Sequence, residues 1–186
     1  MSQRPPRQPE ISVVLAVRDD EETVGHQLRA VAAHLRSLGR AFEILVVNDG
    51  SRDNSLSIAR LLSGQMPELR LITRDSSGRA FLRGAAEAHG AILVLLEAHR
   101  ATSLAPLGWA LSRLASGREA VILRGRYIVA KRLLALPIIV RASGPGLLFE
   151  AVFERRAEEL GIDVVGSRPK REPPLLLRPV LRFLAA

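Results

Sequence analysis

The stretch EILVVNDGSRDNSLSIARLL, residues 43–62, decides which fold the sequence predicts. Its first six residues contain an apolar, β-branched run that is typical of a strand buried on both faces of a sheet. Its last eight residues place apolar side chains at helical steps. Between the two, Gly50 permits a tight turn, and Ser51 or Asp53 can accept hydrogen bonds from the first amides of the helix. The stretch therefore predicts a strand, a turn and a helix, the unit from which α/β sheets are built.

Strand-like and helix-like segments alternate along the rest of the chain as well. This alternation predicts an α/β fold with a mainly parallel sheet, right-handed crossovers and helices on both faces, which makes three layers. The strands are expected at residues 11–17, 42–48, 69–73, 91–97, 119–129 and 162–167. The helices are expected at residues 21–38, 55–64, 78–90, 106–117 and 147–161.

The length of 186 residues, 47% of them hydrophobic, suits one compact domain with its own core. Residues 1–10 are polar and proline-rich and predict a disordered lead, and residues 11–167 form the domain. Residues 168–186 form a basic, apolar tail that either closes the core as a helix or binds a membrane surface or a partner protein. No signal peptide and no membrane span is predicted, so we expect a cytoplasmic protein, peripheral to the inner face of the membrane if the tail anchors it.

The net charge of +8 comes from 27 basic residues, of which only Lys131 and Lys170 are lysines. Arginine pairs with phosphate in a bidentate way, so this charge suits nucleic acid, anionic lipid or a phosphorylated ligand, and equally well solvated helix faces. One Trp, one Tyr and five Phe offer few stacking platforms, so no nucleic-acid partner is expected. The absence of cysteine excludes disulfides and thiolate metal sites. Composition does not define an oligomeric state.

Polar residues follow three of the expected strands, at residues 18–22, 48–53 and 97–100. Ligands of parallel α/β sheets bind beyond the carboxyl ends of the strands, beside helix N-termini. A capping turn explains Gly50 but does not explain Asn48 and Asp49, which end a buried strand where polar side chains are costly unless something satisfies them. We therefore expect a ligand site at this edge of the sheet.

Four segments of the sequence carry a resemblance to a known family. They are ISVVLAVRDDEETV (11–24), FEILVVNDGSRDNS (42–55), SSGRAFLRGAAEAHGAILVLLEAH (76–99) and EAVILRGRYIV (119–129). Their order resembles that of family 2 glycosyltransferases of the GT-A fold, especially the branch that charges polyprenyl phosphates. The resemblance implies a GT-A-like domain that transfers a sugar from a nucleotide-sugar donor to a lipid phosphate or another acceptor.

In that family the segments after the first and second strands hold the base and ribose of the nucleotide-sugar. The resemblance therefore implies that this sequence contacts the donor through the matching positions. They are Ala16, Val17, Arg18 and Asp19 after the first strand, and Asn48, Asp49 and Gly50 after the second. Arg79 joins them because a cation at the start of the third expected helix can reach phosphates, although helical arginines are often simply exposed.

Family members carry Asp-x-Asp after the fourth strand, where two carboxylates hold a divalent metal on the diphosphate. This sequence has a degenerate version of that motif, with Glu97 and His99 in the two ligand positions. We expect these two residues to bind Mn or Mg weakly, and Arg100, Arg79 or Arg126 could replace the metal. The sequence leaves open an active transferase of low turnover and a catalytically degenerate domain that serves as a nucleotide-binding or scaffold module.

No catalytic residue is assigned from the sequence. Glu150 and Glu154, four residues apart on an expected helix, are interpreted as part of a solvated face. Trp109 is expected to anchor its helix in the core.

Overall fold

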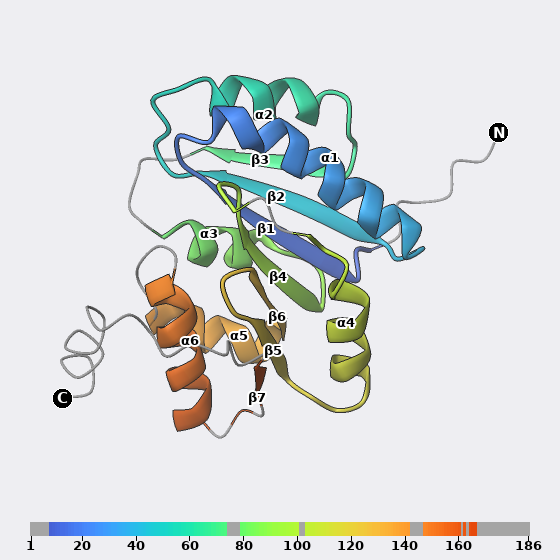
Figure 1. Ribbon diagram of the computed structural model, residues 1–186, viewed down its shortest axis with the longest axis vertical. Helices are drawn as coiled ribbons and strands as arrows, with labels where there is room; N and C mark the ends of the chain where they lie inside the picture. Colours follow the sequence, from blue (N-terminus) through green and yellow to red (C-terminus); the bar gives the residue numbers. More distant parts are fainter. Residues whose placement is uncertain are drawn as a thin grey trace.

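Figure 1 shows a computed structural model of the chain, in which residues 8–73, 79–100, 103–141, 147–160, 162 and 164–166 are described. The described strands form one sheet in the order β3-β2-β1-β4-β6-β5-β7. The strands are β1 (Ile11–Val17), β2 (Phe42–Asn48), β3 (Leu69–Thr73), β4 (Ile92–Glu97), β5 (Ala120–Leu123), β6 (Tyr127–Lys131) and β7 (Val164–Gly166). The helices are α1 (Glu21–Ser37), α2 (Ser55–Ser63), α3 (Ala80–Glu87), α4 (Leu107–Ala115), α5 (Arg132–Arg141) and α6 (Leu147–Glu159).

The sheet is mainly parallel, as the alternation of elements predicts. β3, β2, β1 and β4 run parallel, and β7 runs parallel to β5. β6 is antiparallel to both of its neighbours, β4 and β5. The first three strands have the bounds that the sequence predicts. β1 and β2, which are buried almost throughout, are mainly apolar because a strand covered on both faces needs no polar alternation.

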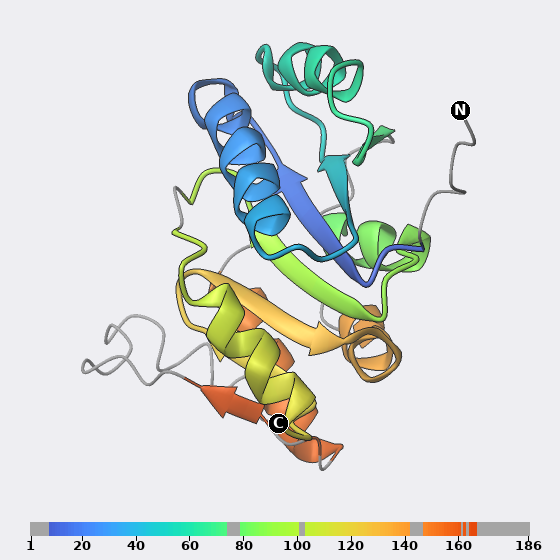
Figure 2. The ribbon, with the colours of Figure 1, turned by 90° about the vertical axis from the view of Figure 1, so that its right-hand side faces the viewer.

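Helices cover both faces of the sheet and complete three layers. Figure 2 shows α1 and α4 on one side of the sheet and α3 and α5 on the other. On the first side Leu15 of β1 lies in one core cluster with Leu28 of α1 and Leu107 of α4. On the second side Val14 of β1 shares a cluster with Phe81 of α3 and Phe153 of α6. Neighbouring side chains of one strand thus pack into two separate core clusters, one on each face of the sheet, which confirms the predicted three-layer α/β architecture.

The segment EAVILRGRYIV forms two strands, so the prediction of a single strand past Gly125 is wrong. β5 ends at Leu123 and β6 begins at Tyr127, and these two residues are paired across an antiparallel hairpin. Gly125 has a φ of 70°, a left-handed conformation that favours glycine, and the Arg126 N–H donates to the Leu123 carbonyl at 2.8 Å. The glycine therefore closes a turn instead of continuing a strand.

Helix α5 is absent from the sequence-based prediction. Its segment, RLLALPIIVR, is apolar on all sides and contains Pro137, so it lacks the polar stripe that marks a helix in the other segments. Ala135, Ile138 and Ile139 are buried, whereas Leu133 is 77% exposed. The helix follows β6 directly and packs on the same face as α3 and α6.

Trp109 is not a core anchor. Its side chain is 40% exposed, and the guanidinium of Arg113 lies over the ring, 5.4 Å from its centroid. The core of α4 is instead formed by smaller residues at helical steps, namely Leu107, Ala110, Leu111 and Leu114. A large aromatic ring does not identify the buried face when an arginine one turn away can cover it.

Parts of the chain that the sequence treats separately lie outside the described residues. These are most of the predicted lead, residues 1–10, and the whole tail, residues 168–186. Within the described ranges, no helix combines the length and the apolar character needed to cross a bilayer.

The buried hydroxyl of Tyr127 is expected to affect the stability of the fold. Its ring is 1% exposed, its hydroxyl finds no hydrogen-bond partner among the described residues, and burial raises its pKa to about 12. We expect Tyr127→Phe to raise the free energy of unfolding at neutral pH by about 1 kcal/mol, because it removes an unsatisfied buried hydroxyl. Between pH 10 and about 12 the unfolded chain ionises this tyrosine and the folded chain does not, so the wild type should lose about 3 kcal/mol that the variant keeps.

Urea unfolding of both proteins at neutral and alkaline pH measures the two effects. Because the chain has a single tyrosine, its tyrosinate absorbance reports the titration of Tyr127 alone. An ordinary tyrosine titration in the folded protein would contradict the burial of this hydroxyl.

Candidate functional site

The candidate site lies at the edge where β1, β2 and β4 end side by side (Figure 1). Ala16 of β1 is in register with Glu97 of β4. The pairing continues one residue past the strands, since the Asp49 N–H donates to the Val17 carbonyl and the Ala98 N–H to the Ala16 carbonyl, each at 2.9 Å. The three polar segments predicted from the sequence are therefore held next to one another. We call this region the carboxyl edge.

Asp19 ties the loop after β1 to the loop after β2. Its backbone has a φ of 54°, a left-handed conformation that is uncommon for residues other than glycine. Its Oδ1 accepts the Arg52 N–H at 2.7 Å, and its own N–H donates to the Ser51 hydroxyl at 3.2 Å. One carboxylate oxygen of Asp19, a residue predicted to contact the nucleotide-sugar, is thus already engaged in a hydrogen bond within the protein. The predicted contact of Asp19 with a donor remains a prediction.

Asp53 joins the starts of α1 and α2. Its Oδ1 accepts the Ser55 N–H at 3.0 Å, and its Oδ2 accepts the Glu21 N–H at 2.9 Å. In the opposite direction, the Glu21 Oε2 accepts the Asn54 backbone N–H at 2.9 Å. The predicted capping role is confirmed for Asp53, which satisfies amides of two helices at once. Ser51 instead accepts from the loop after β1.

Asp20 is a buried carboxylate that the sequence reasoning left out of its ligand set. It is 6% exposed, its N–H donates to the Ser55 hydroxyl at 2.7 Å, and its Oδ2 accepts the Arg18 N–H at 2.8 Å. Burial raises the pKa of Asp20, and the Arg18 hydrogen bond and the positive charge of His99 oppose that rise. The sequence-based prediction assigned Asp19 and not Asp20 to the donor, yet Asp19 is exposed and Asp20 is buried.

Asn48 and Asp49 end β2 as buried polar residues, 7% and 8% exposed. The Asn48 Oδ1 accepts the Ser51 N–H at 3.4 Å, so the turn itself accounts for part of this residue. Gly50 has a φ of 80°, which explains why a glycine stands there. Asp49 directly follows the strand, and its predicted contact with a donor remains a prediction.

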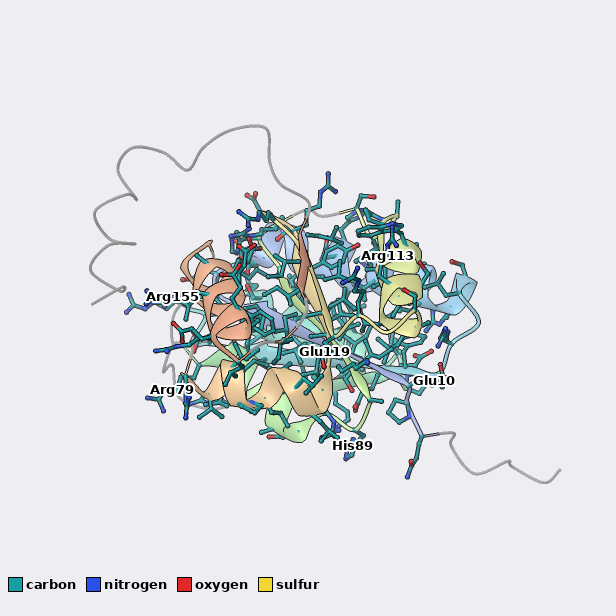
Figure 3. All side chains as sticks on the ribbon, turned by 90° about the horizontal axis from the view of Figure 1, so that it is seen from below. Glu10, Arg79, His89, Arg113, Glu119 and Arg155 are labelled. Carbon is teal, nitrogen blue, oxygen red and sulfur yellow. The ribbon has the colours of Figure 1, made fainter. Side chains whose placement is uncertain are left out.

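Arg79 is exposed and precedes α3. Figure 3 shows its side chain pointing outward at the end of the molecule opposite Glu10, the residue before β1. Arg79 thus lies toward the carboxyl ends of the parallel strands. Its predicted contact with phosphate remains a prediction.

Glu97 and Arg100 form the central ion pair of the loop after β4. Glu97 is 8% exposed, and its Oε2 lies 2.7 Å from Arg100 Nε and 3.5 Å from His99 Nε2. On its other side, Arg100 Nη1 lies 3.6 Å from the Oε1 of Glu150 on α6. A guanidinium whose side chain is 15% exposed therefore sits between two carboxylates.

The interpretation of Glu150 as a solvated residue is wrong. Its side chain is 13% exposed, and its Oε2 accepts the Gly125 N–H at 2.9 Å. Burial raises the pKa of Glu150, against the Gly125 hydrogen bond and the charge of Arg100. Glu154, one turn further along α6, pairs with Arg124 of the same hairpin turn. The sequence could not show this because the hairpin that covers Glu150 was itself not predicted.

A hollow of about 600 Å³ lies at the opposite edge of the sheet, among Arg70, His89 and Arg132. Two of its basic side chains, Arg70 and His89, already pair with Glu43. Glu43, 6% exposed, lies 3.0 Å from Arg70 Nη1 and accepts the His89 N–H at 2.7 Å. Burial opposes ionisation of Glu43, but hydrogen bonds from Ser12 and His89 lower its pKa below the usual value. This network holds the start of β4 against β1 and β2, and we assign it a structural role.

Residues 12–131 match the sequence profile of glycosyl transferase family 2, which covers most of the chain. The chain belongs to glycosyl transferase family 2. The matched region contains β1 to β6, apart from Ile11, and all three segments of the carboxyl edge. Glu150 of α6 lies outside it.

Two curated relatives illustrate the likeness. The chain is 35% identical over 92 residues to an undecaprenyl-phosphate 4-deoxy-4-formamido-L-arabinose transferase of Pseudomonas paraeruginosa, and 28% identical over 92 residues to the enzyme of the same name from Salmonella dublin. Each match covers 47% of this chain and 27% or 28% of the relative. The chain thus matches about a quarter of the length of these curated relatives.

Solved structures confirm the GT-A fold. Glucosyl-3-phosphoglycerate synthase from Mycobacterium tuberculosis, in complex with UDP, superposes with a TM-score of 0.63 at 22% identity, over 90% of this chain and 74% of the other. A mannosyltransferase from Pyrobaculum calidifontis, in complex with GDP-Man and Mn²⁺, superposes with a TM-score of 0.67 at 17% identity, over 88% of this chain and 58% of the other.

A divalent metal does not fit the carboxyl edge as this chain builds it. The structure brings the two predicted metal ligands together, but the Glu97 carboxylate already carries the guanidinium of Arg100, whose charge opposes a second cation. His99, the other predicted ligand, is 57% exposed in its side chain. Across the described residues, no group of three or more histidine, aspartate or glutamate side chains is arranged to hold a metal ion.

Proposed function

We propose that the chain is the donor-binding domain of a glycosyltransferase that passes a sugar from a nucleotide-sugar to a lipid phosphate or another acceptor. The observation that carries the proposal is the gathering of Asp20, Asp49 and Glu97, each under 10% exposed, at the carboxyl ends of three parallel strands. Buried carboxylates at such an edge can accept hydrogen bonds from ribose hydroxyls and base N–H groups. Membership of family 2 supports the same reading.

Neighbours of the same fold support a nucleotide donor. Two of them were solved with UDP and with GDP-Man, so the fold accommodates either base. In this chain we assign Asp49 and Asn48 to the base and ribose, with the backbone of residues 16–18 beside them. Arg79 is assigned to the phosphates because it lies toward the same end of the molecule.

The acceptor class rests on the relatives, which are named for undecaprenyl phosphate. A phosphate monoester is already largely anionic at neutral pH, so its oxygen can attack without a general base. That property suits a site in which no residue stands out as a base from the sequence. We extend the proposal to a location in the cytoplasm, peripheral to the inner face of the membrane, where such an acceptor is reached.

Calorimetry with UDP and GDP tests the proposal. We expect one of the two to bind, and Asp49→Ala to weaken that binding about 10- to 100-fold, as the loss of a charge-assisted hydrogen bond would. Glu158→Ala is the matched control, since Glu158 is an exposed carboxylate on α6, and its affinity should equal that of the wild type. Failure of both nucleotides to bind at millimolar concentration would leave only the degenerate scaffold reading.

A further inference from the structure

The side chain of Arg100 is largely buried and lies between two carboxylates, unlike that of a solvated arginine. Its Nε lies 2.7 Å from Glu97 Oε2, its Nη1 lies 3.6 Å from Glu150 Oε1, and only 15% of the side chain is exposed. Glu150 is fixed in turn, because its Oε2 accepts the Gly125 N–H at 2.9 Å. Three elements, the β4 loop, the β5–β6 turn and α6, therefore position one guanidinium.

The position of this guanidinium decides what it can contact. Glu97 is the last residue of β4 and is in register with Ala16 of β1, so Arg100 lies at the carboxyl edge beside the loops assigned to the donor. Guanidinium groups carry five N–H donors, and Arg100 forms its ion pair with Glu97 through Nε and lies nearest Glu150 through Nη1. The Nη groups have the planar, forked geometry that suits phosphate oxygens.

We propose that Arg100 takes the place of the divalent metal, so that the carboxyl edge binds the diphosphate of a nucleotide without any metal ion. Glu97 and Glu150 are then positioning residues, which hold the guanidinium instead of a cation from solution. The inference rests on the proposed function, since it assumes that a nucleoside diphosphate binds here. In this interpretation of the altered Asp-x-Asp motif, Glu97 still supplies a carboxylate, but the carboxylate pairs with Arg100 and not with a metal ion.

The competing arrangement is disfavoured by charge. A divalent ion on Glu97 would lie beside the positive charge of Arg100, and because both side chains are largely buried, these like charges would repel more strongly than in water. The metal would first have to displace Arg100 from Glu97, and the displaced guanidinium would still be held near the site by Glu150.

Calorimetric titrations of the intact chain with UDP and GDP, in EDTA and in excess MnCl₂, test the inference. We expect the dissociation constant in EDTA to lie within about threefold of that in manganese. Arg100→Gln should weaken binding in EDTA about 10- to 100-fold, as expected for loss of a charged donor to phosphate. Manganese should recover part of that loss in the variant, because Glu97 is then released. Arg113→Gln, which removes an exposed arginine that stacks on Trp109, is the matched control and should bind like the wild type.

The wild-type comparison needs no variant, so it decides the matter even if Arg100→Gln does not fold. Binding that appears only with manganese overturns the metal-free site and leaves the proposed function standing. Binding in neither condition overturns both. Arg100→Lys is a second informative variant, because lysine keeps the positive charge but lacks the planar guanidinium that can bind phosphate through two N–H groups. Retention of metal-free binding in Arg100→Lys, weakened by less than in Arg100→Gln, supports the role of the charge, whereas equal affinity of all three proteins in EDTA contradicts it.

Discussion

Replacement of Gly90 by alanine is expected to lower the free energy of unfolding by about 3 kcal/mol or more. A Cβ at this position would lie 2.7 Å from the backbone nitrogen of Ser12 and 2.8 Å from the backbone carbonyl carbon of Ile11. Those atoms belong to β1, so no side-chain rotation relieves the contact. The Gly90 N–H also donates to the Ser12 hydroxyl at 2.8 Å, which any shift of the loop would break. Urea unfolding followed by circular dichroism measures the loss.

Gly108→Ala is the matched control for this prediction. A Cβ at position 108 would meet only Leu38 Cδ2, at 4.0 Å, and the residue lies inside α4. Alanine in an open helical position should stabilise the protein by about 0.5–1 kcal/mol. The two glycine variants are thus expected to move stability in opposite directions. Similar stability of Gly90→Ala and wild type would show that β1 and the loop before β4 are less tightly packed than the structure has them.

The parallel half of the fold could be predicted from the sequence because β1, β2 and β4 are buried almost throughout. Residues 11–17 and 42–48 are mainly apolar runs with polar or glycine-containing ends, whereas residues 69–73, at the edge of the sheet, form a short and only partly buried strand. The hairpin around Gly125 was missed because its turn, Arg-Gly-Arg, has no Asn-Gly signature and both flanking runs are apolar. A uniformly apolar helix such as α5 shows no period for the same reason.

The place of the site could be predicted, but its internal contacts could not. Strand order alone brings the three polar segments together, since β1 lies between β2 and β4. The contacts of the buried acidic residues involve partners that sequence proximity does not suggest: the Asp20 backbone N–H donates to the Ser55 hydroxyl, and the Glu150 carboxylate accepts the Gly125 N–H. The pairing of Glu97 with Arg100, three residues apart, is a contact that sequence spacing could have suggested.

Loss of the Glu97 carboxylate is expected to have a large effect on the rate of donor hydrolysis. We expect release of nucleoside diphosphate from a nucleotide-sugar donor to fall about 10²- to 10³-fold in Glu97→Ala, the size of effect seen when a group that stabilises developing charge is lost. Glu97 is buried and holds Arg100 at 2.7 Å, so its removal frees the cation that should face the departing diphosphate. Donor hydrolysis with UDP- and GDP-sugars measures the rate. Glu68→Ala, which removes a half-buried carboxylate paired with Arg36 before β3, should hydrolyse the donor like the wild type.

His99→Ala separates the two ways in which Glu97 could act. If Glu97 works by holding Arg100, the imidazole, 57% exposed and 3.5 Å from Glu97, is peripheral, and its loss should cost less than about tenfold in rate. If Glu97 and His99 instead act as a metal pair, each variant should lose as much as the other, and added manganese should raise the wild-type rate. Rates that are unequal and independent of manganese support the arginine-held site. Equal background rates in wild type and both variants, over all donors, would mean that the carboxyl edge performs no chemistry and that the domain keeps its fold for binding alone.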